Sequence, residues 1–455
     1  MDGNRDKAMD WRTIDGFRRE LGQCLRHFDP CFARREGREH LRRYVGGQLS
    51  ALPRKNVEAI ADDAGVPPRT LQDFLATHTW DHPRATDRLQ QWVAEQHHDP
   101  RAIGLIDETS FAKRGDHTAA VQRQYCGATG KIDNCVVSVH LGYAAFDGRF
   151  RCLLDGRLTL PQSWADAPFR RQQAGVPDEL EHQPKWRIAL DLLRRALGNG
   201  VRFNWLVFDE GYGCCVKLLE QLNAMGQSYV AEVPAHFHGW LLPPTVLQKQ
   251  HHVRRTGRPR KYPRLAAKSL PACHVQRLCR HSYPMRDQLW QTFHVKNTHQ
   301  GPVLWRAKAT RFRYRVDGQT SSSTCGGASG GEALPSAPCW LIVAHNVLSD
   351  EIKYFVSNAP AGTPLEILLH VAFSRWHIER LFQDDKSLLG LDHFECRKWQ
   401  AVHRHFVLTA ISHLMLARLR LKLEARGEKT AVDATAPPRR RCVHSGRRPP
   451  SRASP

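Results

Sequence analysis

The amino-acid sequence predicts an α/β protein whose mixed sheet carries acidic side chains, is interrupted by an insertion and follows an all-helical region. In residues 1–100, apolar residues recur at the spacings of three and four that are typical of amphipathic helices. From residue 101 onwards, short apolar runs typical of strands alternate with amphipathic helical stretches. Between residues 234 and 338 the sequence turns basic and proline-rich, and the strand pattern returns only after it.

The helical region contains a segment, VEAIADDAGVPPRTLQDFLA, with the spacing of a helix-turn-helix. Ala61 is the small residue where two helices cross, Gly65 lies in the turn, and Leu71 anchors the second helix. The same spacing also arises by chance, but the adjacent basic PRKN and the charge of the whole chain favour DNA binding. We therefore predict that residues 1–100 form a DNA-binding region, with Arg69 at the start of its recognition helix.

Residues 101–233 predict the first part of a core sheet. AIGLID is a short apolar run that ends in an acid, and two further strands, NCVVSVHLGYAAF and RFRCLLDGRLTL, flank the hairpin dipeptide Asp147-Gly148. A helix (KWRIALDLLRRAL), a strand that ends in an acid (NWLVFD), a second helix and the strand SYVAEVP follow. An antiparallel meander joined in this way to parallel strands is the order of ribonuclease-H-like folds.

The rest of the chain divides by composition. Residues 234–338 predict an insertion, of which 317–338 is a Ser/Gly-rich tract typical of a flexible loop. Residues 339–424 predict the second part of the core, with two strands (CWLIVAHN and IKYFVSNAP) and a helix rich in acids. Residues 425–455 are basic and proline-rich and predict a disordered tail.

The acid-rich helix, RWHIERLFQDDKSLL, has one acid that can face a sheet. At about 100° per residue, Arg375, Glu379 and Lys386 share one narrow face beside an apolar flank that can pack on strands. Asp384 points away from this face, and Asp385 lies off it. We therefore expect Glu379 to look across the end of the sheet, while Asp384 is a solvated surface charge.

Two further acids end predicted strands, Asp107 in AIGLID and Asp209 in NWLVFD. Three carboxylates that converge from two strands and a helix suit two hard divalent cations, which prefer oxygen ligands. Two such ions about 4 Å apart activate a water or hydroxyl and stabilise the leaving oxygen of a phosphodiester. Strand alternation turns Glu108 and Glu210 the other way. Singly, each acid is also compatible with a surface salt bridge or a helix cap.

The charge of the chain favours a polyanionic partner. The formal net charge is +22 and the pI is about 9.8. The insertion contains VRRTGRPRKYPR, which has no acid. Its basic residues are Arg254, Arg255, Arg258, Arg260, Lys261 and Arg264. Gly-Arg-Pro is also the core of a minor-groove AT-hook, but contact with phosphates is the favoured interpretation.

Other sites and locations are disfavoured. CHVQRLCRH (residues 273–281) lacks the short Cys-x-x-Cys knuckle of structural zinc sites, so scattered reduced thiols are expected. There is no run of about twenty apolar residues for a membrane span, and the N-terminus lacks the apolar segment of a signal peptide. These features predict a cytoplasmic protein that does not bind membranes.

Together these motifs resemble the DDE transposases of bacterial insertion sequences. The resemblance is to the superfamily marked by a Tyr-x2-Arg-x3-Glu-x6-Lys motif, and within it to the insertion sequence 701 branch. It extends over roughly residues 25–420. The segments that carry it, in order, are YVGGQLSALPRKNVEAIADDAG, LQDFLATHTWD, IDETSFAKRG, RQYCGATGKIDNC, VFDEGYG, YFVSNAP and RWHIERLFQDDKSLLGLDHFE.

The resemblance implies catalytic and metal-binding roles for Asp107, Asp209 and Glu379. It also implies two Mg²⁺ ions, for which Mn²⁺ can substitute, and cut-and-paste transposition of DNA by a homodimer bound to transposon ends and target DNA at the bacterial nucleoid. Arg375 and Lys386 match the motif's Arg and Lys, which in this family contact DNA phosphates.

This chain departs from the motif at its tyrosine position, which is Ala372. Two alternatives from other classes therefore stay open. One is a DNA-binding descendant that no longer catalyses, and the other is a stand-alone nuclease of the same fold. The three acids favour the transposase, whereas the Ser/Gly tract and the unusual tail favour a decayed copy.

Overall fold

The computed structural model describes residues 11–248, 262–298, 301–316 and 333–425. Most of the predicted basic segment lies outside these ranges, namely Arg254, Arg255, Arg258, Arg260 and Lys261. Most of the Ser/Gly tract and nearly all of the C-terminal tail also lie outside them. What was predicted for these segments therefore stays a prediction.

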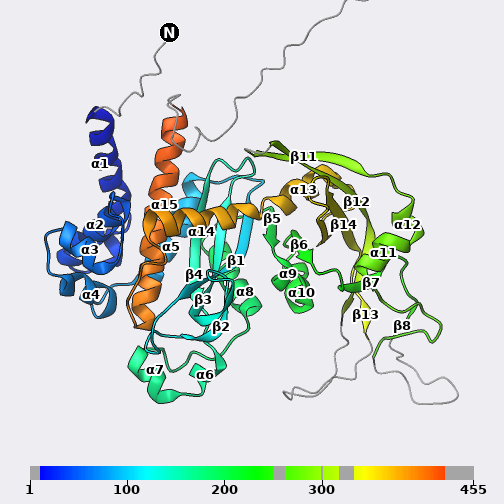
Figure 1. Cartoon of the computed structure of the whole chain (residues 1–455), viewed down its shortest axis with the longest axis horizontal. Coiled ribbons are helices and arrows are strands. Elements are labelled where there is room, and N and C mark those ends of the chain that lie inside the picture. The colour runs from blue at the N-terminus through cyan, green and yellow to red at the C-terminus, as the bar shows by residue number, and fades with distance from the viewer. Residues whose placement is uncertain (1–10, 249–261, 299–300, 317–332, 426–455) are drawn as a thin grey trace, which may run out of the picture.

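Helices make up the first part of the described chain and pack around one long helix from its other end, α15 (Trp399–Ala425) (Figure 1). They are α1 (Trp11–Arg26), α2 (Arg35–Leu49), α3 (Val57–Asp63), α4 (Pro68–Ala76) and α5 (His82–Gln96), with a 3-10 turn, η1 (Asp29–Cys31), after α1. Arg404 of α15 is buried and donates hydrogen bonds to the carbonyl oxygens of Leu75 and His78, at the end of α4. The two ends of the described chain are thereby joined.

The segment with helix-turn-helix spacing forms two helices, α3 and α4. Gly65 lies between them with a φ of +64°, in the left-handed region that glycine adopts without strain. Ala61 and Leu71 are both fully buried, as the spacing predicted. The geometry of this pair therefore agrees with the motif, while DNA binding by it stays a prediction.

One large mixed sheet dominates the rest of the described chain. The order of its hydrogen-bonded strands is β10-β7-β12-β14-β15-β6-β5-β1-β3-β2, with β4 beside β3 and with β11 and β13 beside β12. The strands are β1 (Ile103–Ala112), β2 (Gln122–Cys126), β3 (Lys131–Ala144), β4 (Arg151–Leu158), β5 (Trp205–Phe208), β6 (Tyr229–Val233), β7 (His238–Trp240), β10 (Cys273–His274), β11 (Gln291–Thr298), β12 (Gly301–Val316), β13 (Leu334–Pro335), β14 (Cys339–Asn346) and β15 (Ile352–Ser357). A small second sheet pairs β8 (Val246–Leu247) with β9 (Arg264–Leu265).

The predicted mixed α/β core is confirmed. β3 pairs antiparallel with both β1 and β4, while β1, β5 and β6 pair in parallel. Helices α8 (Lys185–Gly198), α9 (Glu210–Gly213) and α10 (Val216–Ala224) connect the parallel strands, and α6 (Gln162–Ala165) and α7 (Pro168–Ala174) precede them. This order agrees with a ribonuclease-H-like arrangement.

The region predicted as a weakly patterned insertion contributes strands to the same sheet. β12 pairs antiparallel with β14 from Trp305 to Phe312, and its far end pairs with β7. The short helices α11 (Val275–His281) and α12 (Tyr283–Arg286) lie between these strands in the chain. The sheet therefore continues from the core into the insertion.

The acid-rich helix is α14 (Trp376–Leu389), which follows α13 (Leu365–Phe373). Its Ile378 and Leu381 are fully buried and lie close to Gly142 of β3, where a Cβ atom would be 3.1 and 3.2 Å from their methyl groups. The predicted apolar flank therefore packs on the sheet. No helix in the described ranges has the length and apolar character needed to cross a bilayer.

Candidate active site

Asp107 lies inside β1 and not at its end, which corrects the prediction. The antiparallel pairing of β1 with β3 continues to Ala112, whereas the parallel pairing with β5 stops at Leu105 and Val207. Asp107 is thus just beyond the point where β5 leaves β1. Its side chain is buried, and its Oδ1 accepts a hydrogen bond of 2.7 Å from the backbone N–H of Glu108.

Asp209 directly follows β5, as predicted, and its carboxylate also caps the short helix α9 by accepting from the N–H of Tyr212 at 3.2 Å. Burial, together with the negative charge of Asp209, raises the pKa of Asp107 to about 7. The two carboxylates are therefore close enough for the charge of Asp209 to act on Asp107. Glu108 instead pairs with Lys185 at 2.6 Å, in agreement with strand alternation.

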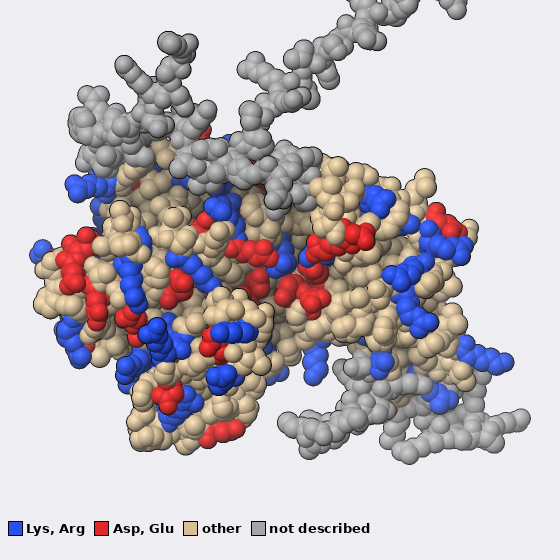
Figure 2. All heavy atoms as spheres, in the orientation of Figure 1, with Lys and Arg blue, Asp and Glu red and all other residues tan. Residues whose placement is uncertain are grey.

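The guanidinium of Arg375 brings Glu379 to these acids. Its Nη1 lies 3.3 Å from Oδ2 of Asp107, and its Nη2 lies 2.5 Å from Oε1 of Glu379. Glu379 is therefore on the same side of the sheet as Asp107, at the start of α14. Its side chain is 56% exposed, so it can be reached from solvent. In the view of Figure 2, acidic side chains gather near the centre of the visible face of the molecule, with Lys and Arg side chains around them.

Sequence reasoning missed a further acid, Glu232 of β6. Its Oε1 lies 2.8 Å from Nζ of Lys353, and its Oε2 lies 3.7 Å from Nε of Arg375. A charged residue within the apolar run SYVAEVP was the signal that could have found it. At Gly213 of α9, a Cβ atom would lie 1.8 Å from the carbonyl oxygen of Glu232. Glycine thus allows α9 to approach the backbone of β6 closely.

Comparison with known proteins identifies the family. The model of a family described as DDE superfamily endonuclease matches residues 27–302. The chain belongs to the DDE superfamily endonucleases. The match includes Asp107 and Asp209 but ends before Glu379, whose assignment rests on the sequence motif and on its position in the structure.

A similar curated protein is described as a probable transposase for insertion sequence element IS701, from Microchaete diplosiphon. It is 30% identical to this chain over 200 residues, which cover 43% of the chain and 49% of the relative. The chain thus matches about half the length of that relative. The resemblance to insertion-sequence transposases inferred from the motifs is confirmed at this level.

In this DDE protein, Lys386 lies on the same face of α14 as Arg375 and Glu379. Its Nζ donates to Oγ1 of Thr109 at 2.7 Å and lies 5.4 Å from the centre of the Phe111 ring. Burial lowers the pKa of Lys386. Thr109 and Asp107 are two residues apart in β1, so their side chains lie on the same face of the strand. Lys386 and Arg375 therefore both contact this face of β1, as expected from their shared face on the helix.

Arg69, the other predicted DNA contact in the described ranges, is far from this grouping in the chain. It lies on α4, where its Nε pairs with Asp73 at 2.9 Å, and its side chain is 77% exposed. An exposed cation on the second helix of the α3–α4 pair is available to a phosphate. Its role stays a prediction.

The neighbouring acids of α14 differ from the prediction. Asp384 is not a solvated charge: it is 18% exposed and pairs with Arg380 at 2.9 Å and with Arg151 at 3.5 Å. Asp385 is fully buried and forms an ion pair with His413 of α15. Helical phase placed both acids off the Glu379 face but could not reveal that α15 and β4 cover them.

Asp107, Asp209 and Glu379 offer only carboxylate oxygens, which are the type of ligand that hard divalent cations prefer. The raised pKa of Asp107 also indicates negative charge that an added cation would compensate. In the present arrangement, however, no three His, Cys, Asp or Glu residues within the described ranges are grouped closely enough to hold a metal ion. The guanidinium of Arg375 contacts the oxygens of Asp107 and Glu379 instead.

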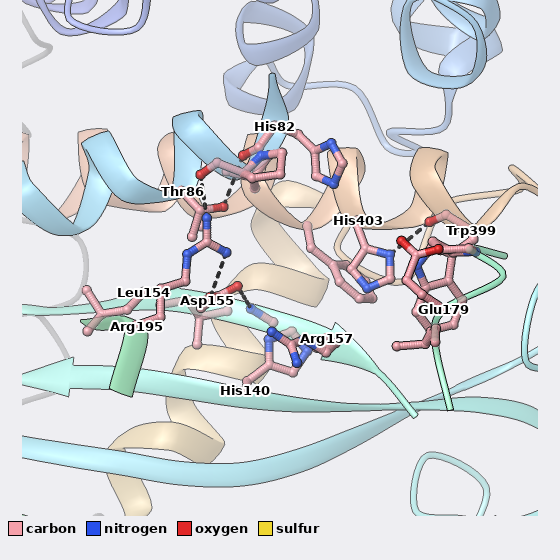
Figure 3. A pocket seen from close by; sticks show the side chains of 18 residues that line it. His82, Thr86, His140, Leu154, Asp155, Arg157, Glu179, Arg195, Trp399 and His403 are labelled. Atoms are coloured by element: carbon pink, nitrogen blue, oxygen red, sulfur yellow. Dashed lines mark hydrogen bonds and ion pairs between the residues drawn. The ribbon is translucent and has the colours of Figure 1, made fainter. Parts of the chain in front are cut away.

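A separate cavity of about 290 Å³ lies between α5, β4 and α15 (Figure 3). Burial lowers the pKa of His82 to about 3 and that of His403 to about 4, so both are neutral. Asp155 is paired with Arg195 at 3.3 Å, and His403 accepts from the N–H of Leu158. The bond between Leu158 of β4 and His403 of α15 joins the sheet to the long helix. The residues that line the cavity do not include the carboxylates around Arg375.

Proposed function

We propose that this protein is a DNA transposase that cleaves DNA at the ends of an insertion sequence and transfers the cut strand to a target. The observation that carries the proposal is that Arg375 contacts both Asp107 and Glu379, with Asp209 near enough for its charge to raise the pKa of Asp107, on a sheet of ribonuclease-H-like order. The transposase description of the IS701 relative supports the same activity.

In this proposal, Asp107, Asp209 and Glu379 would hold two Mg²⁺ ions, for which Mn²⁺ can substitute. When bound, such ions supply an activated nucleophile and neutralise charge on the leaving oxygen. The chain itself positions the DNA: Arg375 and Lys386 flank Glu379 and can each bind a phosphate oxygen. The exposure of Glu379 leaves that side of the site open to a duplex.

The proposed partner is DNA, at both the transposon ends and the target. The net charge of +22 supports binding to a polyanion. Arg69 and the basic segment at 254–264 are the proposed contacts away from the active site. Cut-and-paste transposition by a homodimer at the nucleoid completes the proposal.

A second candidate is a DNA-binding protein without turnover. The observation that favours it is Ala372, which stands at the motif's tyrosine position and is buried beside Phe373. A buried alanine cannot supply the phenol that the motif carries. The acids and basic residues would then be inherited from an active ancestor without taking part in catalysis.

The test uses the full chain, Mg²⁺ and a plasmid that carries the DNA flanking both ends of the gene. Wild type should cut at the ends, and Asp107→Asn and Asp209→Asn should each reduce cleavage at least about a hundredfold, since each removes one carboxylate charge from the proposed metal site. Asp147→Asn, in the exposed hairpin turn, is the matched control and should cut normally. Binding without cleavage would favour the second candidate, and cutting without joining would favour a stand-alone nuclease.

A further inference from the structure

Arg375 contacts three carboxylates from three different elements. Asp107 is on β1, Glu232 on β6 and Glu379 on α14, and their oxygens lie 3.3, 3.7 and 2.5 Å from its guanidinium nitrogens. Burial alone would lower the pKa of Arg375, but the charges of these acids and of Asp209 raise it on balance. Arg375 is thus a cation that contacts Asp107, Glu232 and Glu379 together, while Lys353 pairs with Glu232 alone among them.

The oxygens that Arg375 contacts include those needed for metal binding. Its two Nη atoms each take one acid, Asp107 and Glu379, while its Nε faces Glu232. A divalent cation that used the same oxygens would meet a fixed positive charge within a few ångströms, which opposes its entry. Within the described ranges these acids do not form a group that could hold a metal ion.

We propose that Arg375 is an internal counter-ion that keeps divalent cations out of the acidic group until a DNA phosphate takes its guanidinium. The inference rests on the proposed function and adds a coupling to it: DNA and metal bind cooperatively. Arginine binds phosphate through paired, charge-assisted hydrogen bonds, so a phosphate competes directly with Asp107 and Glu379. Once Arg375 has moved to the phosphate, both acids are released.

The surroundings of Arg375 allow this exchange. Lys353 holds Glu232 in place at 2.8 Å. Glu232 can therefore stay close to Nε of Arg375 while the two Nη atoms move from Asp107 and Glu379 to a phosphate. A cavity of about 340 Å³ opens beside Arg375 and is also lined by Glu379, Glu232 and Lys353. The cavity provides room for a phosphate next to the guanidinium without movement of α14.

The test measures Mn²⁺ binding to the full chain by isothermal titration calorimetry, first without DNA. Arg375→Gln removes the competing charge, so Mn²⁺ should bind about tenfold tighter or more than to wild type. Arg380→Gln is the matched control, since Arg380 pairs with Asp384 at 2.9 Å in the same i,i+4 arrangement on the same helix. Its affinity for Mn²⁺ should equal that of wild type. Adding Asp107→Asn to Arg375→Gln should abolish the gain.

A second measurement needs no variant at Arg375. A 30-base-pair duplex of arbitrary sequence should tighten the binding of Mn²⁺ to the wild-type protein. The background is the Mn²⁺ titration of the Asp107→Asn protein with the same duplex, and it is subtracted. Equal Mn²⁺ affinity in wild type and Arg375→Gln, a gain that survives Asp107→Asn, or no effect of the duplex would each overturn the proposal. The proposed function fails separately, if wild type with Mg²⁺ cuts no DNA.

Discussion

Asp385 of α14 is fully buried against His413 of α15, and the two side chains form an ion pair. The second oxygen of Asp385 has no hydrogen-bond partner within the described part of the chain. Burial raises the pKa of Asp385. Burial alone would lower the pKa of His413, but the charge of Asp385 raises it on balance. This pair therefore links the helix that bears Glu379 to the long C-terminal helix.

The pair predicts a stability that falls as pH rises. Both pKa values are raised on folding, so the folded protein holds protons more tightly than the unfolded chain. The stabilisation by His413 is fully present below its ordinary pKa of 6.5 and is lost as pH rises through its higher folded value. His413→Gln should remove this dependence above about pH 6.5.

Urea unfolding at three pH values checks this prediction. At about pH 6 the variant should lose about 3 kcal/mol, because it leaves the buried carboxylate of Asp385 without a counter-charge. Arg151 and Asp384 also face His413 and remain in the variant. Asp116→Asn, whose side chain is 81% exposed, is the control and should change stability by less than about 0.5 kcal/mol. A variant with the wild-type pH profile would show that this pair does not titrate.

Glu379→Gln should separate catalysis from DNA binding. The change keeps the shape of the side chain but removes one negative charge, so cleavage with Mg²⁺ should fall at least about a hundredfold. Binding to duplex DNA should remain within a few-fold, because no cation is lost. Glu366→Gln is the matched control: Glu366 is exposed in the first turn of α13 and should be dispensable. Equal loss in the two variants would show that Glu379 has no special role.

The sequence was sufficient to predict the core order and the face of α14 that meets the sheet. Periodicity distinguishes strands from helices, and helical phase depends only on spacing, so Arg375, Glu379 and Lys386 were grouped correctly. The structure places Asp107 on β1 and Asp209 directly after β5, and their catalytic role is a proposal.

Tertiary contacts explain what the sequence could not reveal. Asp384 looks like a solvated charge in a local pattern and Asp385 only lies off the Glu379 face, and it is the packing of β4 and α15 that shows their partners Arg151 and His413. The strands of the insertion are stabilised by pairing with β14 and β7, which are distant in the chain. Glu232 was missed because its significance comes from Arg375, far along the chain.

The basic segment should contribute to the salt dependence of DNA binding. Replacing Arg254, Arg255, Arg258, Arg260 and Lys261 by Gln removes positive charges without deleting β9. Each lost phosphate contact should reduce the slope of log affinity against log salt by about 0.9. Fluorescence anisotropy with a labelled duplex from low to moderate salt measures this slope. An unchanged slope would mean that the segment does not contact phosphates.

Arg404 should hold the N-terminal helices to α15. It is 1% exposed and donates to the carbonyl oxygens of Phe74, Leu75, His78 and Trp80, at 2.7 to 3.3 Å. Its guanidinium also lies 4.8 Å from the centre of the Trp80 ring. Lysine has one nitrogen where arginine has a planar fork, so it cannot reach all four acceptors.

Arg404→Met should therefore lower the free energy of unfolding by about 3 kcal/mol or more, because it leaves buried carbonyl groups without donors. Arg404→Lys should recover only part of this loss. Arg397→Met, at an exposed position before α15, is the control and should stay within about 0.5 kcal/mol of wild type. Chemical unfolding followed by tryptophan fluorescence reports the change, since Trp80 is next to Arg404. If Arg404→Lys matched wild type, a single charge would be enough and the four-carbonyl arrangement would not be what joins the two ends of the described chain.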